Sequence, residues 1–282
     1  MNGYRGSPTV TEEAPTEPSR TATSSGPKPG SALFAFNTQE RDRWVAAQAA
    51  LIPPGARVLD VGAGRAPYRP YFAHCDYRAH DFGAELGTQG CYTTLDYVSD
   101  ITAIPAADES FDIILCTEVL EHVPEPILAL GEMARLLRVG GRLLLSAPLG
   151  SNLHQEPYHF YGGYTPYWYQ KFLPECGLCL ESLKPNRGFF SWFGQEAQRF
   201  SALIDPRRTL KHPLAWPGLT LLWLVTLPLC RLVFPCLAPA LDRLKLEAIT
   251  TVGYHVVAIK RPLGELGGKE APNGQDEQKC VE

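Results

Sequence analysis

The sequence predicts a doubly wound α/β fold, in which short buried strands alternate with helices. Residues 57–61 form an apolar run that leads into the turn Gly62-Ala63-Gly64, and glycine lets the main chain turn tightly from a strand into a helix. Residues 111–116 form a second apolar run, as a strand buried on both faces requires. Stretches with helical spacing of apolar residues flank these runs, which favours a parallel sheet covered by helices.

The first expected helix covers residues 38–51. Thr38 can cap its N-terminus, and Trp44, Val45, Ala49 and Leu51 recur at helical spacing before the break at Pro53. This helix is expected to cover the sheet near the ligand-binding edge.

A later helix is expected to place Ile127, Leu130, Met133 and Leu137 on its inner face and to end at Gly140-Gly141. The strands expected along the chain are residues 57–61, 77–80, 111–116, 142–146, 179–183 and 250–259.

Composition favours one domain with appendages. The chain has 282 residues, 45% of them hydrophobic, which suffices for a sizeable core. Its formal net charge of −4 shows no basic footprint, so no nucleic-acid partner is expected. The 8 cysteines are scattered over a large α/β chain, which favours reduced thiols and a cytoplasmic location.

Three segments are expected to stand apart from the core. Residues 1–32 and 263–282 are poor in large apolar groups and are predicted to be disordered or flexible tails. The domain between them covers residues 33–262. It contains an insertion at residues 188–247, which is predicted to be apolar and mostly helical.

The insertion predicts contact with a membrane surface. Residues 213–230 carry no charge, and residues 232–241 continue the apolar run after Arg231. Several prolines are expected to interrupt helical hydrogen bonding, which favours a shallow or re-entrant segment, residues 213–241, over a simple span. A lid over the site and a dimer interface are the alternatives, and the oligomeric state is left open.

Further motifs follow the glycine turn in order along the chain. Asp81 follows the second strand, Asp100-Ile101 comes next, and the turn Leu120-Glu121-His122-Val123 follows the strand at residues 111–116. With the turn at residues 60–64, this set resembles the class I S-adenosylmethionine-dependent methyltransferases over residues 38–185 and 248–261. The resemblance implies a seven-stranded sheet whose last strand runs antiparallel between the fifth and the sixth. Ala66 replaces the usual third glycine, a departure from the general pattern.

The resemblance also implies how S-adenosylmethionine is held. Asp60 and the glycine turn form the wall for the methionine part, and Thr117 lines the cleft near the sulfonium. Asp81 lies about 20 residues past the glycines, where a carboxylate can accept hydrogen bonds from both ribose hydroxyls. Asp100 and Ile101 take the places near the adenine. The predicted cofactor-binding residues are Asp60, Gly62, Ala63, Gly64, Asp81, Asp100, Ile101 and Thr117.

The acceptor-binding side of the pocket is expected after the strand at residues 142–146, where tyrosines and histidines are dense. His154 and His159 are candidate general bases, and His122 is either a base or a residue that holds its loop. A tyrosine-rich loop packed on the sheet is the alternative for this segment. Methyl transfer is an in-line displacement that depends largely on positioning, so the sequence names no required catalytic residue.

Glu118, Glu121 and His122 have side chains that are possible ligands of a divalent ion. The same letters occur widely in relatives that use no metal, and no metal is predicted.

The predicted function is methyl transfer from S-adenosylmethionine to a small-molecule, glycan or lipid-linked acceptor, with oxygen preferred. The expected location is cytoplasmic, with peripheral attachment at the inner face of a membrane. A catalytically inactive scaffold at a membrane is the alternative. A nicotinamide-dependent oxidoreductase would share the glycine turn and Asp81 but not the later motifs.

Overall fold

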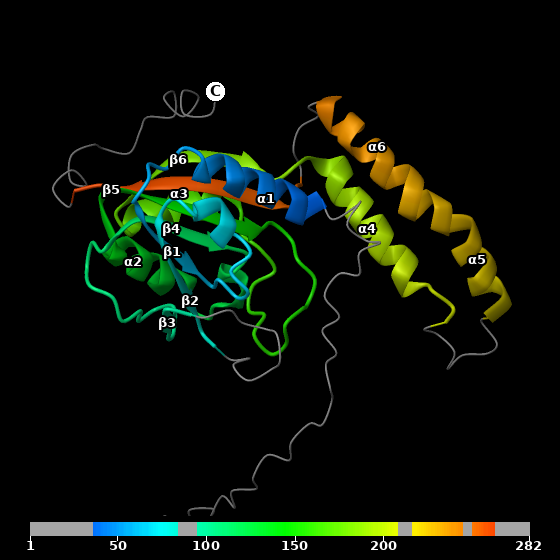
Figure 1. The fold of residues 1–282 in the computed structure, drawn as a ribbon. Coiled ribbons are helices and arrows are strands. Elements are labelled where there is room, and N and C mark those ends of the chain that lie inside the picture. Colours follow the sequence, from blue (N-terminus) through cyan, green and yellow to red (C-terminus); the bar gives the residue numbers. More distant parts are fainter. Residues whose placement is uncertain (1–35, 84–94, 208–215, 245–249, 263–282) are drawn as a thin grey trace, which may run out of the picture. The chain divides into compact units, whose positions relative to one another are not determined.

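A computed structural model describes residues 36–83, 95–207, 216–244 and 250–262 of the protein (Figure 1). The chain divides into two units, residues 1–33 and 34–282. The first unit and the predicted tails, residues 1–32 and 263–282, lie outside the described residues. All the described helices and strands belong to the second unit.

The centre of the fold is a seven-stranded sheet in the order β3-β2-β1-β4-β5-β7-β6 (Figure 1). Neighbouring strands from β3 to β5 are parallel, and β7 is antiparallel to both β5 and β6. This topology confirms the predicted fold class and the reversed last strand. The strands are β1 Arg57–Val61, β2 Asp76–Asp81, β3 Tyr97–Val98, β4 Phe111–Thr117, β5 Leu137–Pro148, β6 Leu178–Pro185 and β7 Gly253–Lys260.

Apolar clusters form on both faces of the sheet. One face packs against helices α2 (Pro126–Leu136) and α3 (Pro166–Glu175), with Leu130 and Met133 fully buried. The other face packs against α1 (Phe36–Ala49) and the 3-10 turn η2 (Arg69–Phe72) through Val45, Ala49 and Phe72. A sheet buried on both sides explains why successive residues are apolar at positions 58–59 in β1 and 113–116 in β4.

Three local predictions were wrong. Helix α1 already includes Phe36, ahead of the expected cap Thr38. Ile127 was placed on the inner face of α2 but is 40% exposed. Helix α2 ends at Leu136 and β5 begins at the next residue, so Gly140-Gly141 lies within the strand. The reason is a bulge: Phe111 pairs with Leu137, but Ile113 pairs with Arg142, and the intervening residues of β5 loop out around Gly140 at φ +77°.

The described residues of the insertion are mostly helical. Helix α4 spans Phe189–Leu203, α5 spans Trp216–Pro228, and a π-helical turn at Leu229–Val233 leads directly into α6 (Phe234–Leu241). Asp242 accepts hydrogen bonds from the N–H groups of Gly188 and Phe190 at the start of α4. Helix α6 therefore returns to the beginning of α4.

The prolines do not interrupt this helix as the sequence predicted. Residues 217–244 form one 28-residue helical run, which is the helix in the described part of the chain that is long and apolar enough to cross a membrane. Pro217 falls in the first turn of α5, where the absent N–H costs little, and Pro228 immediately precedes the π-helical turn, which accommodates it.

Candidate functional site

A cavity of about 600 Å³ opens beside the carboxyl ends of β1, β2 and β4. In open α/β sheets, ligands bind at this edge because the loops after the strands diverge there. Its walls come from the glycine turn, the ends of β2 and β4, and the segment after β5. The lining residues are Gly62, Gly64, Arg65, His80, Asp81, Phe82, Asp100, Ile101, Thr102, Glu118, Val119, His122, Val123, Pro124, Glu125, Gln155, Glu156, Tyr158 and Phe160.

The glycine turn needs glycine for two separate reasons. Gly62 has φ +71° and Gly64 has φ +53°, in the left-handed region that disfavours a side chain. A Cβ on Gly62 would also lie 2.4 Å from a methyl carbon of Val119. The turn can therefore approach the loop after β4, and the two together form one wall of the cavity.

Asp81 links the ends of β1 and β2. Its Oδ2 accepts a hydrogen bond from the N–H of Gly64 at 2.9 Å, and its Oδ1 accepts one from the N–H of Gly83 at 3.2 Å. Each carboxylate oxygen has a second lone pair, so the residue can still accept hydrogen bonds from a ligand. The carboxylate is thus oriented before any ligand is bound.

Asp100 and Ile101 also lie in the cavity wall, as predicted from the sequence. Oδ1 of Asp100 accepts hydrogen bonds from the N–H and the hydroxyl of Thr102 at 2.8 and 2.7 Å. These two bonds lower the pKa of Asp100, which keeps the carboxylate charged. Ile101 is 9% exposed and supplies an apolar surface beside it.

The structure does not bring Asp60, Ala63 or Thr117 to the cavity wall. Asp60 is buried, and its carboxylate accepts a hydrogen bond from the hydroxyl of Tyr77. Burial raises the pKa of Asp60 to about 7. Ala63 is also buried, and its N–H donates to the carbonyl of His80. Asp60 is therefore buried in β1 and bonded to Tyr77 of β2, away from the cavity wall, a position that its place at the end of a strand does not reveal.

Glu118 is held at the cavity wall by three side chains. Ser146 donates to its Oε1 at 2.9 Å, Asn37 donates to its Oε2 at 3.0 Å, and Arg41 lies 3.7 Å from Oε2. Glu118 itself has φ +54°, a strained conformation for a residue with a side chain. Asn37 and Arg41 belong to α1, and sequence reasoning missed both because no local pattern connects α1 with β4.

The three candidate bases form a cluster of imidazole rings. The ring centroids of His122 and His154 are 4.7 Å apart, and His159 lies 4.7 Å from His154 and 5.7 Å from His122. His122 lines the cavity, whereas His154 and His159 do not. His159 pairs with the hydroxyl of Ser151 at 2.9 Å. The cluster thus reaches the cavity through His122.

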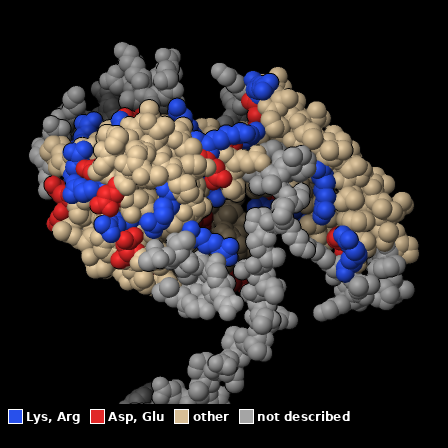
Figure 2. All heavy atoms as spheres, in the orientation of Figure 1, with Lys and Arg blue, Asp and Glu red and all other residues tan. Residues whose placement is uncertain are grey.

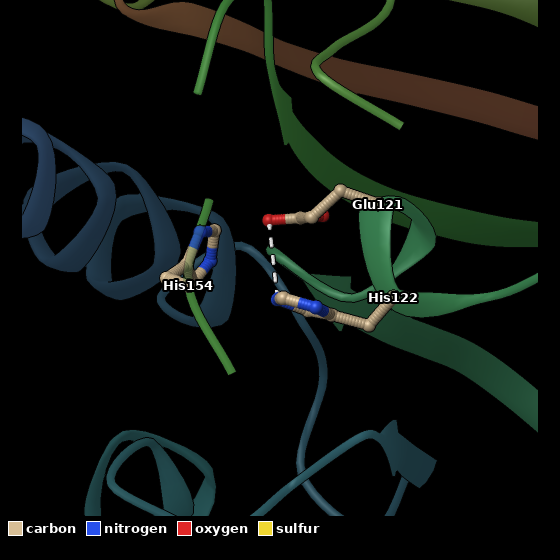
Figure 3. Close-up of side chains that lie close together, drawn as sticks. All are labelled: Glu121, His122 and His154. Atoms are coloured by element: carbon tan, nitrogen blue, oxygen red, sulfur yellow. Dashed lines mark ion pairs between the residues drawn. The ribbon is translucent and has the colours of Figure 1, made fainter. Parts of the chain in front are cut away.

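A buried carboxylate faces this cluster (Figure 3). Glu121 is 1% exposed, and its Oε1 lies 3.9 Å from Nε2 of His122. Burial, aided by the charge of Glu118, raises the pKa of Glu121 to about 8, and burial also lowers the pKa of His122. Both groups therefore favour their uncharged forms near neutral pH.

Comparison with known proteins defines the class. Residues 59–145 match a family model described as a methyltransferase domain. This stretch holds the glycine turn, Asp81, Asp100 and the turn at residues 120–123, on the sheet order described above. Residues 59–145 thus match a methyltransferase domain, and S-adenosylmethionine is the cofactor of the class I methyltransferases, which have this sheet order.

Individual relatives agree with the class. The chain is 38% identical over 128 residues to the ubiquinone biosynthesis O-methyltransferase of Xanthomonas campestris, covering 42% of this chain and 52% of that one. It is 40% identical over 98 residues to the demethylmenaquinone methyltransferase of Renibacterium salmoninarum, covering 33% and 41%. The chain thus spans about half the length, or less, of these curated relatives.

Among solved structures, phosphoethanolamine N-methyltransferase 2 of Haemonchus contortus, in complex with S-adenosyl-L-methionine, aligns with a TM-score of 0.45. The sequence identity is 14%, and the alignment covers 82% of this chain and 56% of that one.

Proposed function

We propose that the protein transfers a methyl group from S-adenosylmethionine to a small-molecule acceptor. The observation that carries the proposal is the orientation of Asp81, whose carboxylate is fixed by Gly64 and Gly83 at the cavity wall. A fixed carboxylate at the end of the second strand suits the two hydroxyls of a ribose. The match of residues 59–145 to the methyltransferase domain supports the same assignment.

Different cavity residues hold different parts of the cofactor. Asp81 accepts hydrogen bonds from the ribose, Ile101 packs on the adenine, and the main chain at Gly62 and Gly64 admits the methionine part without steric conflict. S-adenosylmethionine supplies an electrophilic methyl group on a sulfonium. The chain's own contribution is to hold the acceptor in line with that methyl group, from which much of the acceleration of such displacements comes.

Oxygen is the acceptor atom that we propose. The relative from Xanthomonas campestris is named an O-methyltransferase, and the imidazole cluster around His122 offers bases that could take a hydroxyl proton. Tyr158 and Phe160 line the cavity beside His122 and provide aromatic surface for the acceptor. Aromatic faces also suit the positive charge of a sulfonium.

A binding experiment separates this proposal from dinucleotide chemistry. S-adenosylhomocysteine should raise the melting temperature of the purified protein, because a ligand at about 100 times its Kd adds about 2.7 kcal/mol to the free energy of unfolding. NAD⁺ at the same concentration should leave it unchanged. The opposite pattern would contradict the proposal.

We further propose that the helix of residues 217–244 attaches the protein to a membrane. A helix of about 20 apolar residues is long enough to cross a bilayer. This helix has 28 residues in all, and 17% of its most apolar 18-residue stretch is buried. Figure 2 shows the outer face of α5 and α6 almost free of charged side chains. The exposed large apolar residues of α5, the π-helical turn and α6 are Leu221, Leu222, Leu224, Val225, Leu229, Leu232, Val233 and Leu237. A lipid-linked acceptor is the substrate class that such attachment favours.

Vesicle flotation tests the attachment. The wild-type protein should float with phosphatidylglycerol vesicles, and a Leu221→Asp, Val225→Asp, Leu232→Asp variant should stay in the soluble fraction. Leu51→Asp is the matched control, because Leu51 is 69% exposed and lies outside the insertion. A wild-type protein that does not float would contradict the proposal, as would a triple variant that floats equally well.

A further inference from the structure

Three hydrogen-bond acceptors converge beside the cavity, from Glu121, His122 and His154. One ligand atom from each lies within 4.8 Å of the other two. Figure 3 shows the side chains of Glu121 and His122 extending from their turn toward His154, whose segment of chain lies opposite that turn. This group differs from the trio considered in the sequence, because a histidine from a distant loop replaces Glu118.

The hydrogen bonds of the two histidines fix their tautomers. Nδ1–H of His122 donates to the carbonyl of Tyr158 at 2.6 Å, and Nδ1–H of His154 donates to the carbonyl of Asn152 at 2.8 Å. A carbonyl only accepts, so each neutral ring has its proton on Nδ1 and a lone pair on Nε2. Metal-bound histidines have this arrangement, in which the second ring nitrogen donates to a carbonyl that orients the ring.

Glu121 gives an independent sign of a ligand site. The residue is 1% exposed, and its Oε2 is buried with no hydrogen-bond partner among the residues that the structure describes. Its Oε1 faces the lone pair of His122 Nε2 at 3.9 Å. Two acceptors that face each other gain nothing unless a proton or a cation lies between them, and an unsatisfied buried oxygen is costly.

Glu118 does not take part because its oxygens are already engaged. Ser146 bonds one oxygen, and Asn37 and Arg41 contact the other. Arg41 offsets the charge of Glu118, whereas in the described part of the chain the ion pair of Glu121 is with His122, when that ring is protonated.

We propose that Glu121, His122 and His154 bind a divalent transition-metal ion in the wall of the methyltransferase cavity. Two imidazole nitrogens and one carboxylate suit zinc, manganese or cobalt, whereas magnesium and calcium prefer oxygen ligands alone. Three protein ligands leave coordination positions open. The ion would adjoin the cavity through His122, which lines it.

Cobalt titration of the metal-free, full-length protein tests the site. Co²⁺ should bind one ion per chain with visible bands typical of nitrogen and oxygen ligands, and Zn²⁺ should displace it. His122→Ala, His154→Ala and Glu121→Gln should each weaken binding at least tenfold. Mg²⁺ at the same concentration should not compete.

Two controls make the outcome decisive. His74→Ala should bind cobalt as the wild type does, because His74 contacts the carbonyl of Ile52, away from the cluster. His154→Ala should retain affinity for S-adenosylhomocysteine, because His154 does not line the cavity. Binding of this compound thus tests the proposed function separately from the metal. Absence of cobalt binding, binding with thiolate bands, or equal binding by the three variants would overturn the proposal.

Discussion

The carboxylate of Asp81 is bonded to the N–H of Gly64, at 2.9 Å, across the ends of two neighbouring parallel strands. This bond connects Asp81, the residue predicted to bind the ribose of the cofactor, with the glycine turn that is predicted to lie against its methionine part. Because the turn requires positive φ at Gly62 and Gly64, the orientation of Asp81 depends on residues that have no side chain of their own.

Gly62→Ala should lose both stability and cofactor binding. The new Cβ would meet Val119 at 2.4 Å, and φ is +71°, so the free energy of unfolding should fall by about 2 kcal/mol or more. Gly131→Ala is the matched control, since this glycine of α2 is exposed and has open space around it. It should stabilise the protein by about 0.5–1 kcal/mol, as alanine favours helix interiors. Urea denaturation measures both changes, and equal behaviour of the two variants would contradict the account of the turn.

Asp60 should make stability depend on pH. Burial raises its pKa in the folded protein to about 7, whereas an unfolded aspartate has a pKa of about 3.9. The folded state holds the proton more tightly than the unfolded state does. Protonation of Asp60 therefore stabilises the fold fully below pH of about 4, and this stabilisation is lost as pH rises through about 7. Three pKa units correspond to about 4 kcal/mol at most.

Asp60→Asn removes this titration while its amide oxygen can still accept the hydrogen bond from Tyr77. The unfolding free energy of the variant should fall less between pH 4 and 7 than that of the wild type. Parallel curves for the two proteins would show that Asp60 titrates normally.

Much of the fold was predictable because its signals are local. The bounds of β1 are those expected, and Asp81 is the last residue of β2. The partner of Asp60 was not predictable, because Tyr77 is 17 positions away and nothing in its surroundings marks it. Contacts of Glu118 with α1 and the approach of His154 to His122 are likewise set by the fold and leave no periodic pattern in the sequence.

The insertion is a place where a local sequence signal predicted the wrong structure. Prolines were expected to break the helix, yet the chain continues through a π-helical turn at Leu229–Val233. The composition predicted an exposed apolar segment, but the accommodation of Pro228 depends on how one turn widens, which residue propensities do not describe.

Asp242→Ala should loosen the helices of the insertion. Its carboxylate accepts from the N–H groups of Gly188 and Phe190 at 3.2 and 3.0 Å and from the hydroxyl of Ser191, which satisfies the exposed donors at the start of α4. Loss of such a cap costs about 1–2 kcal/mol. Hydrogen exchange of the α4 amides should accelerate, while Asp108→Ala, which alters an exposed aspartate elsewhere, should leave them unchanged. Unchanged α4 exchange in the Asp242 variant would mean that this cap contributes little.

Isothermal titration with S-adenosylhomocysteine tests the central claim most directly, using wild type, Asp81→Ala and the control Asp76→Ala. Asp76 lies at the other end of β2, and its side chain is 54% exposed. Wild type and control should bind equally. Asp81→Ala should bind about 10 to 100 times more weakly, because hydrogen bonds to a charged group contribute about 1.5–3 kcal/mol. Wild-type affinity in a folded Asp81→Ala variant, or no binding by the wild type, would contradict the account.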